Sequence, residues 1–193
     1  MAGAGPGRAG GPMRLRPATL DGSWHAEIDQ IGDDRGFFAR IWDEADFAAV
    51  GAAVRNVQTN LSYNRHKGTI RGLHWQVEPY GETKFVRCTR GSVFDVAVDL
   101  RPESPTYRQW QGLVLSAEER NLVFVPAGCA HGYQALEDGA EVSYQVSHAY
   151  VPGSERGIRW DDPTIGIEWP ITDGVIVSAK DGAWPFLEPS AAR

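Results

Sequence analysis

Apolar and polar residues alternate with a period of two through the middle of the chain. Between residues 92 and 100 one set of alternate positions is wholly apolar (Phe94, Val96, Val98 and Leu100), and the other set includes two aspartates. Further short apolar runs cover residues 84–90, 110–119, 122–128, 132–137 and 140–150. This alternation is typical of β-strands, and many short strands broken by turn-rich segments predict an all-β sandwich or barrel.

Turn and helix signals divide the strand-rich region. Arg90-Gly91 splits residues 84–100 and predicts a hairpin between the two halves. The segment from Asp43 to Val50 opens with acidic residues and ends before a glycine, so we expect a two-turn helix there. Ser116 with Glu119 has the spacing of a capping box and predicts one more helical turn. The expected architecture is therefore all-β with a few short helices.

Length and composition define the expected organisation. The 193 residues, 42% of them hydrophobic, suit one domain with its own core. Residues 1–13 are rich in Gly, Ala and Pro without an apolar run, which predicts a flexible tail rather than a secretory signal, followed by a single domain over 14–193. No stretch approaches the roughly 18 apolar residues of a membrane span. We expect a cytoplasmic protein without a membrane partner.

The charge balance narrows the choice of ligand. A formal net charge of −6 argues against nucleic acid as the partner, because nucleic-acid binders present a basic surface. A local pocket can still be cationic, and all but three of the 19 basic residues are arginines, which suit phosphate. Cys88 and Cys129 form neither a disulfide framework nor a zinc motif, so we expect buried, reduced thiols.

Two short segments resemble the halves of the cupin signature, which marks small β-barrels with histidines at the mouth: GTIRGLHWQ at 68–76 and PAGCAH at 126–131. His74 and His131 keep histidine positions of that signature. Gln76 and Lys84 stand where metal-binding cupins have a second histidine and a glutamate. Two histidines are fewer than the usual ligand set, and a lysine ammonium repels a cation. We therefore expect a pocket that binds no metal.

Longer matches run from Asp34 to Leu187. They are DRGFF at 34–38, the spaced Gln58, Asn60 and Ser62, GTIRGLHWQ at 68–76, KFVRCTRGSVFDVAVDLRPESPTY at 84–107, VPAGCAHGY at 125–133, SYQVSHAYVPGSERGIRWDDPTIGIEWP at 143–170 and VSAKD at 177–181. Together they resemble the dTDP-4-dehydrorhamnose 3,5-epimerases over nearly the whole chain after the tail. The resemblance implies a cupin-type jelly-roll β-barrel, a homodimer, and neither metal nor other cofactor.

The resemblance also implies the chemistry. Its substrate is a nucleotide-linked 4-keto-6-deoxyhexose such as dTDP-4-keto-6-deoxyglucose, whose C4 ketone acidifies the hydrogens on C3 and C5. His74 is then the base, Asp181 pairs with it, and Lys84 stabilises the enolate oxygen. Tyr144 is the acid on the opposite face. The residues themselves indicate only that Tyr144 points into the barrel, because it shares an apolar strand face with Val142.

Other positions are implied to contact the substrate through its nucleotide, diphosphate or sugar. They are Arg35, Gln58, Asn60, Arg71, His131, Tyr150, Glu155 and Lys180. One position departs from the family, which commonly reads R-G-x-F-x-E where this chain reads RGFFAR. Arg40 thus replaces an acid that contacts the nucleotide, which leaves the nucleoside open.

Several alternatives remain at the level of sequence. An epimerase that inverts one carbon, or that acts on a different nucleotide-linked 4-keto sugar, would keep His74 and Lys84. A non-catalytic jelly roll that binds nucleotide sugars would have no need of Tyr144 and Asp181 around His74. A metal-dependent cupin conflicts with Gln76 and Lys84. The pathway, dTDP-L-rhamnose or another deoxysugar, also stays open.

Overall fold

The computed structural model describes residues 13–52 and 55–188. The strands in this part of the chain are β1 (Arg14–Pro17), β2 (Trp24–Glu27), β3 (Gln30–Asp33), β4 (Gly36–Ala39), β5 (Gln58–Asn64), β6 (Thr69–Gln76), β7 (Lys84–Arg90), β8 (Ser92–Asp99), β9 (Trp110–Ser116), β10 (Leu122–Val125), β11 (Cys129–Ala135), β12 (Ala140–Val146), β13 (Glu155–Gly157) and β14 (Ile176–Val177). The helices are α1 (Glu44–Ala49) and α2 (Ala179–Gly182). Among these residues no helix has the length and apolar character needed to cross a membrane.

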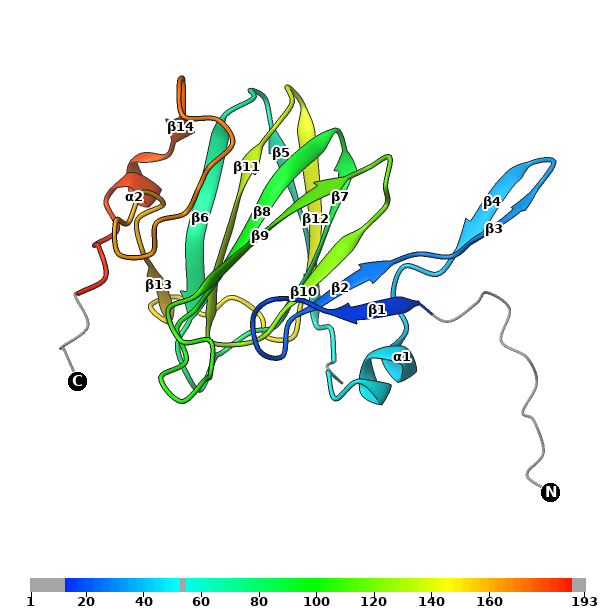
Figure 1. Ribbon diagram of the computed structural model, residues 1–193, viewed down its shortest axis with the longest axis horizontal. Coiled ribbons are helices and arrows are strands. Elements are labelled where there is room, and N and C mark those ends of the chain that lie inside the picture. Colours follow the sequence, from blue (N-terminus) through cyan, green and yellow to red (C-terminus); the bar gives the residue numbers. More distant parts are fainter. Residues whose placement is uncertain (1–12, 53–54, 189–193) are drawn as a thin grey trace.

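Two sheets face each other and form most of the molecule (Figure 1). The first sheet has the strand order β1-β2-β10-β7-β12-β5, and the second has the order β13-β6-β11-β8-β9, with β14 in parallel beside β6. A separate hairpin, β3-β4, extends away from both sheets (Figure 1). Most neighbours in each sheet are distant in sequence, which is the arrangement of a jelly roll. The all-β prediction is confirmed.

The first residue that the structure describes is tied to the first helix. Met13 is buried, and its backbone N–H donates a hydrogen bond to the Asp46 carboxylate at 2.9 Å. It packs in the same apolar cluster as Phe47 of α1. The other residues of the predicted tail, 1–12, lie outside the described part of the chain.

Apolar side chains form three layers. One cluster lies between the sheets and takes residues from β7, β10 and β12 of the first sheet and from β8, β9 and β11 of the second. Another covers the outer face of the first sheet, where α1 packs. The third lies on the outer face of the second sheet and includes Ile158, Ile165 and Trp169 from the segment after β13. Both faces of each sheet are therefore partly covered.

Strand β8 packs against apolar side chains on both of its faces. Val93 and Ala97 point into the cluster between the sheets. The wholly apolar set, which includes Val96 and Val98, packs outside the barrel with Trp169. The carboxylates therefore share the inward face, and the apolar face is covered by the chain that follows β13.

The predicted hairpin at Arg90-Gly91 is wrong. Strand β7 pairs with β10 and β12, whereas β8 pairs with β11 and β9, so the two halves belong to different sheets. Gly91 has φ +67 and carries the chain across between the sheets. A glycine turn signals a reversal, but the pairing partner is decided by which neighbours each strand meets.

The helix prediction is confirmed, and the second cap signal forms a turn only. The Asp43 side chain accepts hydrogen bonds from the N–H groups of Ala45 and Asp46 and begins α1. The Ser116 hydroxyl accepts from the N–H of Glu118 at 3.1 Å, but the chain makes a turn there and enters β10 without a helix. A cap without a following apolar helical pattern does not propagate.

Candidate active site

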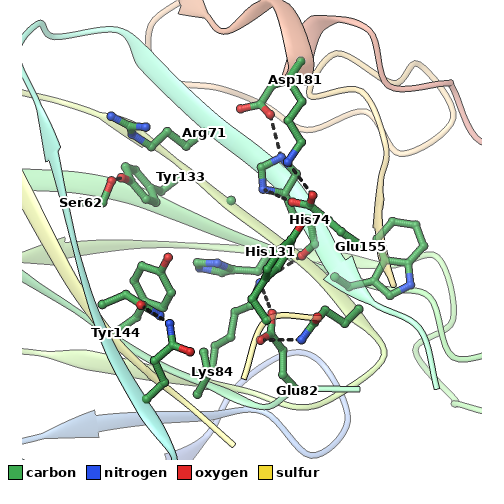
Figure 2. A pocket seen from close by; sticks show the side chains of 18 of the residues that line it. Ser62, Arg71, His74, Glu82, Lys84, His131, Tyr133, Tyr144, Glu155 and Asp181 are labelled. Carbon is green, nitrogen blue, oxygen red and sulfur yellow. Dashed lines mark hydrogen bonds and ion pairs between the residues drawn. The ribbon is translucent and has the colours of Figure 1, made fainter. Parts of the chain in front are cut away.

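A cavity of about 460 Å³ opens between the two sheets. Its walls come from β5, β7 and β12 of the first sheet and from β6, β11 and β13 of the second, closed on one side by α2. Of the predicted site residues, those that line it are Gln58, Asn60, Arg71, His74, Lys84, His131, Tyr144, Tyr150, Glu155, Lys180 and Asp181. Figure 2 shows His74, Lys84 and Tyr144 directed toward the same space.

His74 is oriented by a carboxylate that lies 107 residues further along the chain. Its Nε2 lies 2.7 Å from Asp181 Oδ1, and the other oxygen of Asp181 accepts the N–H of Gly72 at 3.2 Å. Ser178 caps α2 by accepting the N–H of Asp181 at 3.0 Å, which places this carboxylate at the end of the cavity. The two residues are 107 positions apart, so the contact between them depends on the fold.

The pairing determines which nitrogen of His74 is free to react. Burial acts to raise the pKa of Asp181, but the hydrogen bond and charge of His74 outweigh it and hold that pKa below its usual range. An ionised Asp181 accepts the Nε2–H, so the lone pair of the neutral imidazole lies on Nδ1. Nδ1 lies 3.9 Å from Glu155 Oε1, beyond hydrogen-bond distance. It can therefore accept a proton from a ligand.

Tyr144 approaches the cavity from the opposite sheet. It lies on β12 and packs with Val142 against the core between the sheets, so the predicted inward direction is confirmed. Burial raises the pKa of the phenol, and the nearby Tyr133 and Glu82 raise it further. The hydroxyl is therefore protonated at neutral pH and can donate a proton.

Lys84 begins β7 and is buried. Its Nζ donates a hydrogen bond to the backbone carbonyl of His74 at 3.1 Å, which links the ammonium to strand β6. The ammonium thus lies in the cavity with a fixed donor geometry. A preorganised cation of this kind stabilises negative charge that develops on a bound oxygen.

His131 has a carboxylate partner that the sequence prediction did not include. Its Nε2 lies 2.8 Å from Asp95 Oδ2, and both side chains are buried. Asp95 lies on the inward face of β8, next to β11 in the second sheet. The period-two pattern places Asp95 on the strand face opposite the apolar set, and this was the sequence feature that could have pointed to Asp95. The pair fixes the orientation of His131 at the cavity wall.

The rim of the cavity carries polar and cationic groups. Arg71 donates to the Asn64 side chain at 2.8 Å and to the backbone carbonyl of Tyr63 at 3.0 Å. Gln58 Nε2 donates to Asn60 Oδ1 at 2.7 Å. Lys180 pairs with Glu155, and that hydrogen bond raises the pKa of the Lys180 ammonium. Tyr150 is exposed. This rim can bind an anionic, polar ligand.

Tyr133, Ser62 and Glu82 also line the cavity and were not among the predicted residues. The Tyr133 hydroxyl donates to Ser62 Oγ at 2.7 Å, and burial raises the pKa of this phenol. Tyr133 lay within a predicted strand and Ser62 within a family motif, but neither carried a signal that separates a cavity wall from a core residue.

Arg35 is the exception among the predicted site residues. It lies at the exposed turn between β3 and β4, and its guanidinium binds Asp33. It does not line the cavity of its own chain. Arg40, the departure from the family pattern, forms an ion pair with Asp43 at 3.3 Å and also lies off the cavity wall.

The two cysteines are free and buried, as expected. Burial raises the pKa of the Cys88 thiol. Burial, with a smaller contribution from the charge of Asp99, raises the pKa of Cys129 to about 12. Thiols in this state are poor nucleophiles.

The barrel and its cavity define a class of protein. A histidine oriented by a carboxylate on one sheet faces a protonated tyrosine on the other, with an ammonium in the same cavity. The fold is a cupin-type jelly roll, and the protein is an enzyme of the isomerase class. The chain matches the family described as dTDP-4-dehydrorhamnose 3,5-epimerase over residues 17–189, and it belongs to that family.

Relatives and solved structures agree with this assignment. The chain is 46% identical over 158 residues to the dTDP-4-dehydrorhamnose 3,5-epimerase of Sinorhizobium fredii, covering 82% of this chain and 81% of the relative. It is 41% identical to a dTDP-4-dehydrorhamnose 3-epimerase of Streptomyces niveus, covering 88% and 81%. A 3,5-epimerase from Legionella pneumophila, solved with dTDP-4-keto-L-rhamnose, is 37% identical with a TM-score of 0.84, covering 90% and 92%.

Proposed function

We propose that this protein inverts C3 and C5 of a dTDP-linked 4-keto-6-deoxyhexose in the biosynthesis of dTDP-L-rhamnose or a related deoxysugar. The observation that carries the proposal is the arrangement of His74 with Asp181 on one side of the cavity and Tyr144 on the other. Epimerisation needs a base and an acid on opposite faces of one carbon. The site supplies both, with Lys84 for the oxygen between them.

The reaction is a pair of proton transfers. His74 Nδ1 takes the proton from the carbon next to the ketone. The C–H electron pair forms a C=C bond while the carbonyl π pair moves onto the oxygen, which gives an enolate. The Lys84 ammonium stabilises the negative charge on that oxygen. Tyr144 then donates its proton to the opposite face of the same carbon, and solvent exchange restores both groups. No electron is gained or lost, so the reaction requires no redox partner.

The rim is proposed to bind the nucleoside diphosphate. Arg71 and Lys180 supply positive charge for phosphate oxygens, and Gln58 and Asn60 supply amide groups for the nucleoside. His131 and Glu155 contact the sugar or the diphosphate, and the exposed Tyr150 ring can stack on the base. The Legionella pneumophila structure with dTDP-4-keto-L-rhamnose supports a ligand of this class.

A single-centre epimerase is the second candidate. The Streptomyces niveus relative, named as a 3-epimerase, supports it because the match covers 88% of this chain. A mono-epimerase needs the same base, acid and cation.

Proton exchange tests the proposal. The enzyme is mixed with dTDP-4-keto-6-deoxyglucose in heavy water, and proton NMR follows the C3 and C5 signals. Wild-type protein should exchange both hydrogens. His74→Ala should lower both rates by about 10²–10⁴-fold, the usual worth of a general base, while dTDP binding persists.

Each other outcome has a defined meaning. Exchange at C3 alone identifies a single-centre epimerase. Binding of dTDP without any exchange by the wild type contradicts the proposal and favours a non-catalytic nucleotide-sugar-binding protein. Exchange by His74→Ala at a rate close to that of the wild type removes His74 from the role of base.

A further inference from the structure

Glu82 is a carboxylate in the cavity that the acid–base scheme does not use. Its side chain is 13% exposed, and its Oε1 lies 3.3 Å from the Nζ of Lys84. It belongs to the short segment between β6 and β7, so its position relative to the cavity depends on how that segment is held. Figure 2 shows Glu82 beside Lys84 on the cavity wall.

The Lys84 ammonium has two protein partners. A lysine ammonium has three N–H donors and no acceptor. One is directed at the His74 carbonyl, 3.1 Å away, and Glu82 Oε1 forms an ion pair with the same Nζ at 3.3 Å. The ammonium therefore keeps N–H groups for a ligand in the cavity, and its hydrogen bond with His74 and its ion pair with Glu82 restrict where it lies.

Glu82 is itself held in place by Gln76. The Gln76 amide nitrogen donates to Glu82 Oε2 at 3.2 Å and toward two backbone carbonyls. Its oxygen accepts from the N–H of Val151 at 2.8 Å and from the Ser154 hydroxyl at 2.7 Å. Gln76 is buried, so these bonds fix both ends of its amide. The residue that replaces a metal-ligand histidine thus forms a rigid support for Glu82.

We propose that Glu82 is a positioning residue that orients the Lys84 ammonium toward the enolate oxygen, with Gln76 holding Glu82 in turn. The inference rests on the proposed function, in which Lys84 stabilises that oxygen. Without Glu82, the ammonium keeps a single protein partner and can rotate about its long side chain. A misplacement of the order of 1 Å at a reacting centre can cost about 100-fold in rate.

Glu82 can act on the site through its contact with Lys84 or through its negative charge, and the two effects can be separated by substitution. Its negative charge also acts on Tyr144, where it contributes to the raised pKa of the phenol. Glu82→Gln removes the charge but keeps a side-chain oxygen for Lys84 at nearly the same volume. Glu82→Leu removes both. The pair of variants therefore separates orientation from charge.

The experiment measures kcat by deuterium exchange at C3 and C5, dTDP affinity by calorimetry, and the thermal midpoint for each variant. Glu82→Leu should lower kcat by about 10- to 100-fold with dTDP affinity unchanged. Glu82→Gln should restore most of the wild-type kcat. Glu137→Leu is the matched control, because Glu137 accepts a hydrogen bond from Ser92 outside the cavity, and it should leave kcat unchanged.

Three results would overturn the inference. They are an unchanged kcat in Glu82→Leu, an equal loss in Glu82→Gln, and a loss of dTDP affinity and thermal stability in proportion to kcat. If Glu82→Leu does not fold, Glu82→Ala replaces it with the same expectations. Absence of exchange in the wild-type enzyme would instead contradict the proposed function, so the two failures are distinguishable.

Discussion

The titratable side chains of the cavity differ in whether they carry a proton. Asp181 is ionised because its hydrogen bond with His74 holds its pKa low, whereas burial keeps Tyr144 protonated. Asp181 orients His74, whose Nδ1 can accept a proton, and Tyr144 lines the same cavity from the opposite sheet with a proton to donate. Such a division is what a two-sided proton transfer requires.

Tyr144→Phe should separate proton removal from inversion. His74 can still take a proton and Lys84 can still stabilise the enolate, but the opposite face lacks its donor. The imidazolium then returns a proton to the face it came from, so deuterium enters with little change of configuration. The measurement is the ratio of deuterium incorporated to centres inverted, which should rise well above the wild-type ratio.

The control for this ratio is Tyr107→Phe, which removes an exposed phenol outside the cavity and should leave the ratio unchanged. If Tyr144 served only to pack the core, exchange and inversion would fall together and the ratio would stay constant. That result would require another acid.

Among the single elements, the end of β8 depends on one buried carboxylate. Asp99 accepts hydrogen bonds from Arg101 Nη2 at 2.7 Å and from Thr106 Oγ1 at 2.7 Å, and Ser104 also donates to it. These bonds fold the segment after β8 back onto the strand. Burial acts to raise the pKa of Asp99, but the hydrogen bonds from Arg101, Ser104 and Thr106 outweigh it and lower it to about 2.

Asp99→Asn should therefore destabilise the fold in a pH-dependent way. A pKa lowered from 3.8 to about 2 corresponds to about 2 kcal/mol of unfolding free energy. Because the folded pKa is the lower one, this stability is complete above the unfolded pKa of about 4 and is lost as pH falls toward about 2. Urea unfolding should show the full difference from wild type at pH 7 and a smaller one at pH 3.

Asp161→Asn provides the comparison, since its ion pair with Arg159 is about one-third exposed. Pairs of this kind contribute at most about 1 kcal/mol. A difference for Asp99→Asn that is equally small at pH 7, or that is constant between pH 7 and pH 3, would contradict the assignment of Asp99 as the ionised centre of this network.

Across the whole molecule, the β3-β4 hairpin exposes apolar side chains. Ile31, Phe37 and Phe38 are each about half exposed on a hairpin that extends away from the sheets (Figure 1). Exposed apolar surface of this kind marks an interaction site. A symmetric homodimer would cover it, and Arg35 at the hairpin turn would then lie against the second copy.

The expected mass in solution is about twice 21.2 kDa by sedimentation equilibrium. Phe38→Asp places a charge on the exposed hairpin and should shift the protein toward the monomer. Phe186→Asp, at an exposed aromatic side chain near the other end of the chain, should leave the mass unchanged. A fully active wild-type monomer at micromolar concentration would contradict the dimer.

The sequence determined the features that depend on local pattern. Period-two alternation identified the strands from β7 to β12 and the inward direction of Tyr144, and an acidic cap identified α1. The family resemblance, rather than local pattern, identified most of the cavity lining. The strands, the direction of Tyr144 and α1 follow from neighbours along the chain, where side-chain direction is set by the geometry of one strand or one turn.

Only the tertiary structure decided which segments meet. Gly91 joins strands of different sheets rather than a hairpin, because each strand pairs where its hydrogen bonds and apolar face are satisfied. The hydrogen bond from the Val151 N–H to Gln76 and the pairing of His131 with Asp95 arise where segments distant in sequence meet. Such contacts join segments that are distant in sequence, so they are decided by tertiary packing and not by residue spacing.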